Sequence, residues 1–269
     1  MFLKKAILPS HKANRMKNEG DVINARNYFY EKKTHQNLFF LLKYRYIWMN
    51  KFIKGNHTGL EVGAGTGISK EFIKCKNYFT SDFSNYDYLD YKNVDALNTE
   101  FDDEKFDFII SSNMIHHVPY TISFFKEMDR ILKPGGKLII QEINGSFMMR
   151  LLLKIMRHEG YNYEINVFNK DQICTNPDDL WSANCVIPNL LFDNIESFEN
   201  NIQEFKVIHS SHSEFLNFIN SGGVIAKTFF IPLPKIGLKL FKKIDDFLSK
   251  TYPTIFALQR QIVLEKTKR

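Results

Sequence analysis

Apolar runs of strand length alternate with polar and helical patterns between about residues 57 and 144. Three such runs end at Val62, Ser81 and Ser112, and a fourth follows a Lys-Pro-Gly-Gly turn that begins at Lys133. A helical pattern over residues 121–132 precedes that turn. Strands that alternate with helices are typical of a parallel sheet, because a parallel connection has to cross over the sheet. The pattern therefore predicts an α/β fold.

The segments on either side of this core have other patterns. Residues 1–20 have no clear periodicity and are expected to be poorly structured. A dense apolar and aromatic segment around Trp48 predicts helices between Asp21 and Lys54. The last predicted helix, from Pro234 to Lys250, has an apolar face. Members of that face are Leu240, Phe241, Ile244, Phe247 and Leu248. Helices are further predicted over 145–158 and 187–204, and strands over 205–211 and 256–266.

These patterns divide the chain into four parts. We expect an N-terminal arm with covering helices (1–54), a core (55–144), a helical and loop lid (145–204), and a C-terminal part that completes the sheet and carries a basic amphipathic helix (205–269).

The net charge of +6 is concentrated at the two ends of the chain. Residues 1–20 carry +4 and residues 235–269 carry +6, so the remainder is negative. A basic terminal segment can favour an anionic membrane or a nucleic acid. A solvated, lysine-rich surface is the simpler interpretation.

The three cysteines, Cys75, Cys174 and Cys185, are far apart and odd in number, which favours a reducing compartment. No C-x-x-C pattern or His/Cys cluster occurs, so no metal is expected. Lysines interrupt the apolar N-terminus and the stretch 222–241, which argues against a signal peptide and a spanning helix. We expect a cytoplasmic protein, with peripheral contact at the inner face of a membrane as the alternative.

The segment Leu60-Glu61-Val62-Gly63-Ala64-Gly65-Thr66-Gly67 predicts a strand that ends in a glycine turn, after which a helix begins. Glycine lets a backbone turn tightly and approach a ligand closely. A dinucleotide fingerprint would need Gly or Ala at position 68, where Ile68 stands, and no P-loop pattern is present. The acidic Glu61, two residues before Gly63, suits a ligand that carries an ammonium group.

This segment resembles the first motif of class I S-adenosylmethionine (SAM) dependent methyltransferases. Four further features follow in the order of that family: Asp82 after the second strand, Asp95 in Val94-Asp95-Ala96-Leu97 after an expected third strand, and the segments 106–118 and 132–142. The resemblance covers about Leu60 to Asn144 and is greatest to ubiquinone/menaquinone-type and polysaccharide-cluster enzymes. It implies a Rossmann-like, doubly wound, mostly parallel seven-stranded sheet with an antiparallel last strand, N-terminal helices, and a helical lid inserted after strand five.

The resemblance also implies SAM as the cofactor and assigns residues to it. Glu61 is expected to hold the ammonium group, and Asp82 the ribose hydroxyls, because a carboxylate accepts two hydrogen bonds. Asp95 is expected to bind the adenine amino group, with the amide beside it on a ring nitrogen. The complete expected set is Glu61, Gly63, Ala64, Gly65, Gly67, Asp82, Phe83, Asp95, Ala96, Ser112 and Asn113.

Candidate catalytic residues follow the fourth and fifth strands. A hydroxyl acceptor must lose its proton as it attacks, and a histidine titrates near neutral pH. His117 and His116 stand where a base would be needed, and Glu142 is a further candidate for a base or a substrate contact. These residues could instead only line the pocket or hydrogen-bond a loop amide.

The acceptor is expected to be a small molecule or a lipid-linked saccharide. Loose similarity of Asp179–Asn184, Ser221-Gly222-Gly223 and Val263–Lys266 to polysaccharide-cluster methyltransferases favours O-methylation of a sugar or glycolipid. A quinone-pathway C-methyltransferase and a SAM-binding domain without turnover are the alternatives. Nucleic acid is not expected, because Ser112-Asn113-Met114-Ile115 replaces the [DNS]-P-P-[YFW] motif of base-methylating enzymes. Peripheral membrane contact is possible, and the oligomeric state is not predicted.

Overall fold

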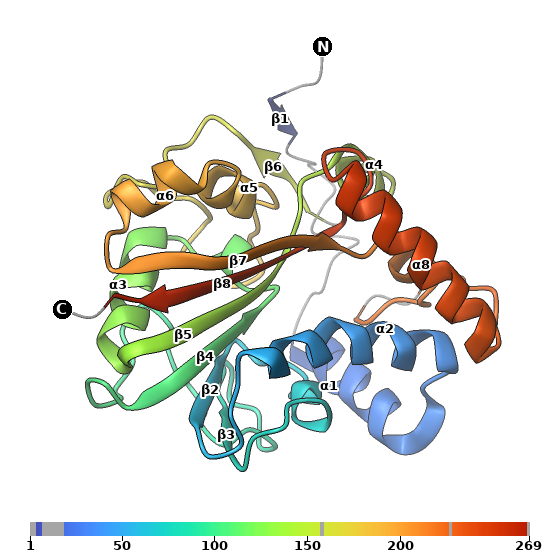
Figure 1. Cartoon of the computed structure of the whole chain (residues 1–269), viewed down its shortest axis with the longest axis horizontal. Helices are drawn as coiled ribbons and strands as arrows, with labels where there is room; N and C mark the ends of the chain where they lie inside the picture. The colour runs from blue at the N-terminus through green and yellow to red at the C-terminus, as the bar shows by residue number, and fades with distance from the viewer. Residues whose placement is uncertain (1–3, 7–18, 157–158, 226–227, 268–269) are drawn as a thin grey trace.

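The computed structural model describes residues 4–6, 19–156, 159–225 and 228–267, and a six-stranded sheet forms its centre (Figure 1). Strands β2 to β5 pair in parallel, while β8 lies antiparallel between β5 and β7. The expected α/β fold with an antiparallel last strand is confirmed. In the order β3-β2-β4-β5-β8-β7, the strands are Asn77–Thr80, Thr58–Val62, Phe106–Ser112, Leu132–Ile143, Gln259–Lys266 and Phe205–Ser213.

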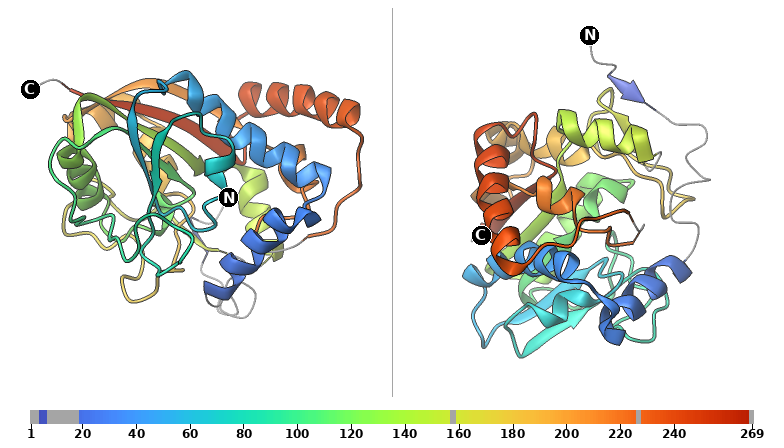
Figure 2. Two further views of the ribbon diagram at one scale, coloured as in Figure 1. Left: turned by 90° about the horizontal axis from the view of Figure 1, so that it is seen from below. Right: turned by 90° about the vertical axis from the view of Figure 1, so that its right-hand side faces the viewer.

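Helices cover both faces of this sheet (Figures 1 and 2). One face packs against α3, α5 and α6, and the other against the 3₁₀ segment Trp48–Lys51 that follows α2. The α-helices are Glu19–Tyr28 (α1), Gln36–Ile47 (α2), Thr121–Ile131 (α3), Phe147–Met156 (α4), Ile187–Phe192 (α5), Ile195–Asn201 (α6), Leu216–Ile219 (α7) and Lys235–Thr251 (α8). A π-helical segment, Phe29–Lys33, follows α1 and precedes α2.

The side chains of β4 divide between these two layers, with an irregularity in its pairing between Phe106 and Phe108. Phe106 and Ile109 join the apolar cluster on the α3 side, whereas Phe108 and Ile110 join the cluster that contains Trp48. The four β4 side chains are fully buried. A parallel strand covered on both faces requires a nearly continuous apolar run, which explains why this strand could be recognised in the sequence.

The sheet has one strand fewer than expected. The strand predicted before Asp95 is reduced to a single parallel bridge between Ser81 and Tyr91. Asn93, which follows, has a φ of 53°. This left-handed conformation turns the chain away before further pairs can form. The prediction of seven strands is therefore wrong for the described residues, whose main sheet has six.

Two predicted helices are shorter than expected. After the glycine turn, Ile68–Glu71 forms one 3₁₀ segment, because β3 begins soon afterwards at Asn77 and leaves no room for a longer helix. The predicted helix over 187–204 is divided into α5 and α6. Asn194 interrupts it because its side chain accepts a hydrogen bond from the Ser197 amide at 2.9 Å, a typical N-cap contact.

The N-terminal arm contributes a short strand that the sequence did not indicate. Lys5–Ala6 (β1) pairs antiparallel with Tyr161–Asn162 (β6). The expectation of a poorly structured arm is therefore wrong at residues 4–6, while residues 1–3 and 7–18 lie outside the described part. His158, at the end of the helix predicted over 145–158, lies outside it as well.

Helix α8 is oriented differently from the expectation. Leu240, Ile244 and Phe247 of the predicted apolar face are 58%, 41% and 61% exposed, whereas Asp245 is 2% exposed. The carboxylate of Asp245 accepts hydrogen bonds from the Leu216 amide and from the Asn217 side chain, at the start of α7. These bonds hold the polar side of α8 against the protein, so that part of its apolar side faces outward.

Candidate functional site

The predicted site residues meet at one edge of the sheet. The glycine turn follows β2, Asp82 lies shortly after β3, and His116 and His117 come just after β4. Glu142 is near the end of β5. Because parallel strands end at the same edge, residues that are distant in the sequence gather there, which is where α/β folds bind ligands.

The glycine turn has the backbone conformation that its sequence requires. Gly63, Gly65 and Gly67 have φ values of 67°, 50° and 64°, in the left-handed region that favours glycine. A Cβ at Gly63 would lie 2.4 Å from the Cγ of Met114. At Gly65 a Cβ would make only an ordinary contact with a methyl of Val22, at 3.8 Å, so among the described residues this side of the turn is not crowded.

Glu61 holds the glycine turn to the strands. Its carboxylate is 1% exposed and accepts hydrogen bonds from the hydroxyls of Ser69 and Tyr78. Burial raises the pKa of Glu61 to about 7, although the bonds from Ser69 and Tyr78 act in the opposite direction. The structure thus places Glu61 beneath the turn, and its contact with an ammonium group stays a prediction.

Asp82 connects the end of β3 to the glycine turn. One carboxylate oxygen accepts a hydrogen bond from the Gly65 amide at 2.8 Å, and the other from the Ser84 amide at 2.9 Å. Asp82 is partly exposed, and the neighbouring Phe83 side chain is 51% exposed. The carboxylate is therefore fixed in place beside the turn, next to an aromatic ring.

The remaining predicted cofactor residues are placed around this group. Asp95 accepts a hydrogen bond from the Leu97 amide at 2.8 Å, and Ala96 packs against the core. Asn113 has a φ of 53°, and its side-chain oxygen accepts a hydrogen bond from Gln259 at 2.9 Å. Ser112 ends β4 beside it. The roles assigned to these residues stay predictions.

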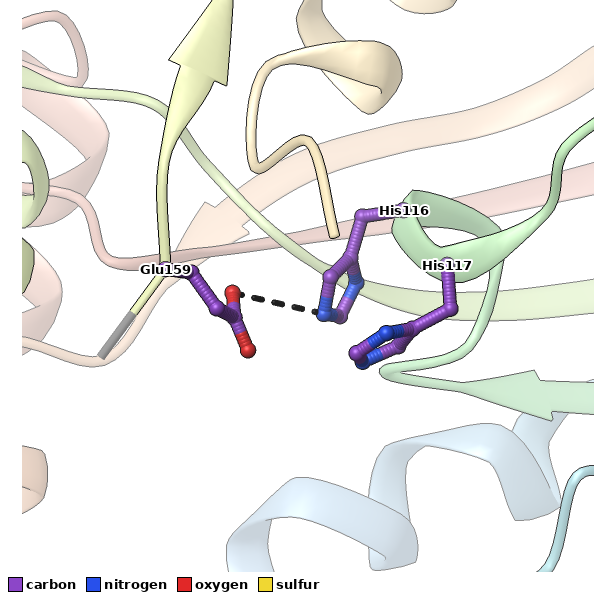
Figure 3. A group of neighbouring side chains, drawn as sticks. All are labelled: His116, His117 and Glu159. Carbon is purple, nitrogen blue, oxygen red and sulfur yellow. Dashed lines mark ion pairs between the residues drawn. The ribbon is translucent and has the colours of Figure 1, made fainter. Parts of the chain in front are cut away.

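The two histidines lie on a 3₁₀ turn, Ile115–His117, and point towards Glu159 (Figure 3). The Nδ1 atom of His116 is 2.7 Å from a carboxylate oxygen of Glu142, and its Nε2 atom is 3.7 Å from Glu159. The Nδ1 atom of His117 is 3.0 Å from the carbonyl oxygen of Ser182. The structure thus brings the three predicted catalytic residues together and adds Glu159, which the sequence did not single out.

The electrostatic environments of the two histidines differ. Burial lowers the pKa of His116, but the negative charges of Glu142 and Glu159 outweigh it and raise the pKa to about 10. Burial and the positive charge of His116 lower the pKa of His117 below its usual value. At neutral pH the pair therefore consists of one imidazolium and one neutral imidazole, which can accept a proton.

The segment 160–185 wraps over the histidines. The Thr175 hydroxyl donates to the carbonyl of His117 at 2.7 Å, and the Asn184 amide donates to that of His116 at 2.9 Å. The Trp181 ring stands edge-on to His117 with centroids 6.3 Å apart, and it packs in the same cluster as Ala64 of the glycine turn. Trp181 therefore lies between the histidines and the glycine turn.

Sequence reasoning also missed Arg26 and Tyr88, which cover the glycine turn. The guanidinium of Arg26 on α1 donates to the carbonyl of Thr66 at 2.7 Å and lies over the rings of Tyr30 and Tyr88. The Tyr88 hydroxyl donates to the carbonyl of Gly65 at 3.0 Å. No local pattern marks these residues, because each acts through a segment distant in the sequence.

A cavity of about 350 Å³ lies at the opposite edge of the sheet. It is lined by residues 51–54 and 133–137 together with His57 and Asp107. Asp107 is already engaged by the Thr58 amide at 2.8 Å and by Lys133 at 3.0 Å. The left-handed glycine turn and the buried charged histidine lie at the other edge, and we therefore place the functional site there.

None of the helices in the described ranges has the length and hydropathy that a membrane span needs.

Comparison with known proteins identifies the central segment. Residues 60–140 match the model of the family described as a methyltransferase domain. Over 89 residues the chain is 33% identical to a demethylmenaquinone methyltransferase of Staphylococcus epidermidis, and this match covers 33% of each chain. Over 50 residues it is 42% identical to phosphoethanolamine N-methyltransferase 2 of Caenorhabditis elegans, covering 19% of this chain and 11% of that protein. The similarity thus spans about a third or less of these two relatives.

The fold is similar to that of a SAM-dependent methyltransferase from Archaeoglobus fulgidus. The TM-score is 0.50 at 14% sequence identity, with 84% of this chain and 93% of that chain covered. At this identity the likeness supports the fold alone, which is the class I, Rossmann-like methyltransferase fold.

Proposed function

We propose that this chain, whose residues 60–140 form a class I methyltransferase domain, transfers a methyl group from SAM to a hydroxyl of a sugar or glycolipid. The observation that carries the proposal is the juxtaposition of two parts at one edge of the sheet. One is the left-handed glycine turn fastened to Asp82, and the other is the histidine pair held by Glu142.

The cofactor part fits SAM in shape and charge. The uncrowded side of the turn at Gly65 lies beside the Asp82 carboxylate, which accepts hydrogen bonds from diol hydroxyls and would repel a phosphate. We assign Asp82 to the ribose, Asp95 and the Ala96 amide to adenine, and the region of Glu61 to the ammonium group. When bound, SAM supplies a methyl carbon on a positively charged sulfur, which leaves as a neutral thioether.

The acceptor part orients the hydroxyl nucleophile and accepts its proton. His116, charged and held between Glu142 and Glu159, fixes the position of the turn that carries His117. His117 is neutral and partly exposed, so its imidazole can contact an acceptor hydroxyl. The segment around Trp181 acts as the lid and keeps water from the reacting atoms. Positioning of this kind contributes several kcal/mol to methyl transfer.

The outer surface of α8 supports a lipid-linked acceptor. Ile236, Leu240, Ile244 and Phe247 recur at helical spacing and are 83%, 58%, 41% and 61% exposed. Exposed lysines border this apolar stripe: Lys235, Lys239, Lys243 and Lys250. An apolar stripe bordered by lysines is typical of helices that lie in the interface of an anionic membrane. We therefore propose peripheral membrane contact through α8.

A second candidate function is C-methylation of a quinone-type acceptor. The similarity over 89 residues to a demethylmenaquinone methyltransferase favours it. The two candidates need different acceptors, one with a hydroxyl on a saccharide and one with a ring carbon, and product analysis distinguishes them.

The test has a binding stage and a turnover stage. Calorimetry with SAM and S-adenosylhomocysteine is expected to give one site, which Asp82→Ala weakens at least tenfold, since a lost hydrogen bond to a charged group costs about 1.5–3 kcal/mol. Asp87→Ala is the matched control, because it removes an exposed acid on the loop that follows. Equal affinity in wild type and Asp82→Ala would remove Asp82 from the site, and no binding at all would end the proposal.

For turnover, SAM labelled in its methyl group is incubated with the protein and with separated lipid and water-soluble bacterial extracts. An acid-stable O-methyl sugar supports the proposal. Label on a quinone ring carbon supports the second candidate instead. SAM binding without transfer to any fraction supports a SAM-binding domain without turnover.

A further inference from the structure

We propose that His116, His117 and Glu159 bind one divalent first-row transition-metal ion, such as Zn²⁺, at the acceptor part of the site. This inference rests on the proposed function, because the ion would bind an oxygen of the acceptor. The sequence indicated no metal, since Glu159 is far from the histidines along the chain and belongs to no metal-binding pattern.

The three donor groups converge from two segments. One ligand atom from each of His116, His117 and Glu159 can be chosen so that all three lie within 4.8 Å of one another (Figure 3). The His116 Nε2 and Glu159 oxygen atoms, 3.7 Å apart, are too distant for a hydrogen bond. Ligands at about 2.0–2.2 Å from a tetrahedral ion stand about 3.3 Å from one another. Small side-chain rotations would therefore bring these donors onto one ion.

Both imidazoles are already oriented as metal ligands are. Glu142 engages the Nδ1 atom of His116 at 2.7 Å, and the Ser182 carbonyl engages that of His117 at 3.0 Å. In each ring the Nε2 atom is left as the coordinating nitrogen. An oxygen acceptor on the second ring nitrogen is the usual support of a metal-bound histidine, because it fixes both the tautomer and the ring orientation.

The supporting carboxylate is itself held firmly. One oxygen of Glu142 accepts hydrogen bonds from the Met114 and Ile115 amides at 2.5 and 2.6 Å, and the other from the Ile143 amide at 3.0 Å. Glu142 is fully buried. An outer group fixed by three amides keeps His116 in one orientation, which is what a preformed site requires.

Charge favours a cation at this position. Glu142 and Glu159 are both buried and face the histidine pair from two sides. Two buried carboxylates are costly unless positive charge compensates them. A divalent ion would replace the proton of His116, which would pass to water, and between two neutral imidazoles the ion would balance both charges at once.

The donor types select the class of ion and leave room for the acceptor. Two imidazoles and one carboxylate suit zinc and iron(II), whereas Mg²⁺ prefers oxygen ligands. Three protein ligands leave a coordination position open, and coordination there lowers the pKa of a bound hydroxyl. The proton of the acceptor would then pass to water, and His117 would position the acceptor through the ion instead of taking the proton itself.

The test is metal binding to the full chain, with no acceptor present. After removal of metals with a chelator, calorimetry with Zn²⁺ and absorption spectra with Co²⁺ are expected to show one equivalent bound. Mg²⁺ is expected to bind far more weakly. Glu159→Gln, which keeps the shape of the side chain, is expected to weaken Zn²⁺ binding about a hundredfold, and Glu142→Gln about tenfold through the loss of support.

His57→Gln is the matched control, because it removes a histidine at the opposite edge of the sheet and is expected to bind Zn²⁺ as the wild type does. Thermal unfolding of each variant without metal shows whether it folds, and His117→Gln replaces any that does not. Equal Zn²⁺ affinity in wild type and in a folded ligand variant overturns the inference. SAM calorimetry on the same samples separates the outcomes: SAM binding without Zn²⁺ binding ends only this inference, and Zn²⁺ binding without SAM binding ends the proposed function.

Discussion

The two parts of the site are built in different ways. The part that we propose for the cofactor is mainly one continuous segment, 60–67, to which we also assign Asp82 and Asp95, and its shape comes from three left-handed glycines. The part that we propose for the acceptor joins residues separated by 26 positions, as for His116 and Glu142, or by 65, as for His117 and Ser182. A ligand common to many enzymes can be bound by a local backbone motif, whereas an individual acceptor requires side chains that only the whole fold brings together.

The largest effect is expected at the glycine turn. Gly63→Ala should lower the free energy of unfolding by about 2–5 kcal/mol, because a left-handed alanine costs about 1–2 kcal/mol and crowding against Met114 adds about 1–3 kcal/mol. SAM binding should be lost as well. Urea unfolding and calorimetry measure both effects. Gly55→Ala is the control, since a Cβ there meets no described atom within 4 Å. Similar stability for the two variants would show that the turn is not rigid.

The second effect concerns the acid beneath the turn. The pKa of Glu61 is about 7 in the folded protein against 4.5 ordinarily, so the folded state binds the proton more tightly. The contribution of Glu61 to stability is therefore greatest below pH 4.5 and falls by about 3 kcal/mol as the pH rises through 7. Glu61→Gln should remove this dependence. Unfolding curves at pH 5 and about pH 7.5 test it, and parallel pH profiles for the two proteins would contradict it.

The third effect separates the two parts of the site. His117→Gln should slow methyl transfer about a hundredfold while SAM affinity stays within about twofold, because we assign His117 to the acceptor part alone. Single-turnover rates and calorimetry provide the two measurements, and His57→Gln serves as the control. A parallel loss of rate and SAM affinity would mean that the two parts are coupled.

The smallest effect lies outside both parts. Phe247→Ser on α8 should reduce flotation with anionic vesicles severalfold and change the free energy of unfolding by no more than about 0.5 kcal/mol, as for other exposed positions. Ile208→Ser is matched to it, since Ile208 is 44% exposed on β7. Equal flotation of both variants and the wild type would exclude α8 as the membrane contact.

Parts of the structure could be predicted because the determinants are local. The continuous apolar run of β4 reflects burial on both faces, and the glycines at 63, 65 and 67 reflect positive φ angles. The prediction of a third strand was wrong because Asn93 adopts a left-handed conformation, which no apolar pattern indicates. The orientation predicted for α8 was wrong because the Asp245 carboxylate accepts hydrogen bonds from residues of α7. An isolated helical pattern contains no information about these contacts.

The sequence by itself thus determined the α/β fold, the class of domain, and the candidate site residues that follow the strands. Tertiary structure alone decided that Glu159 faces the histidines, that Glu142 and Ser182 orient both rings, and that Arg26 covers the glycine turn. The reason is physical. Backbone conformation and strand burial depend on neighbouring residues, whereas a cluster of charges depends on distances between segments, and folding sets those distances.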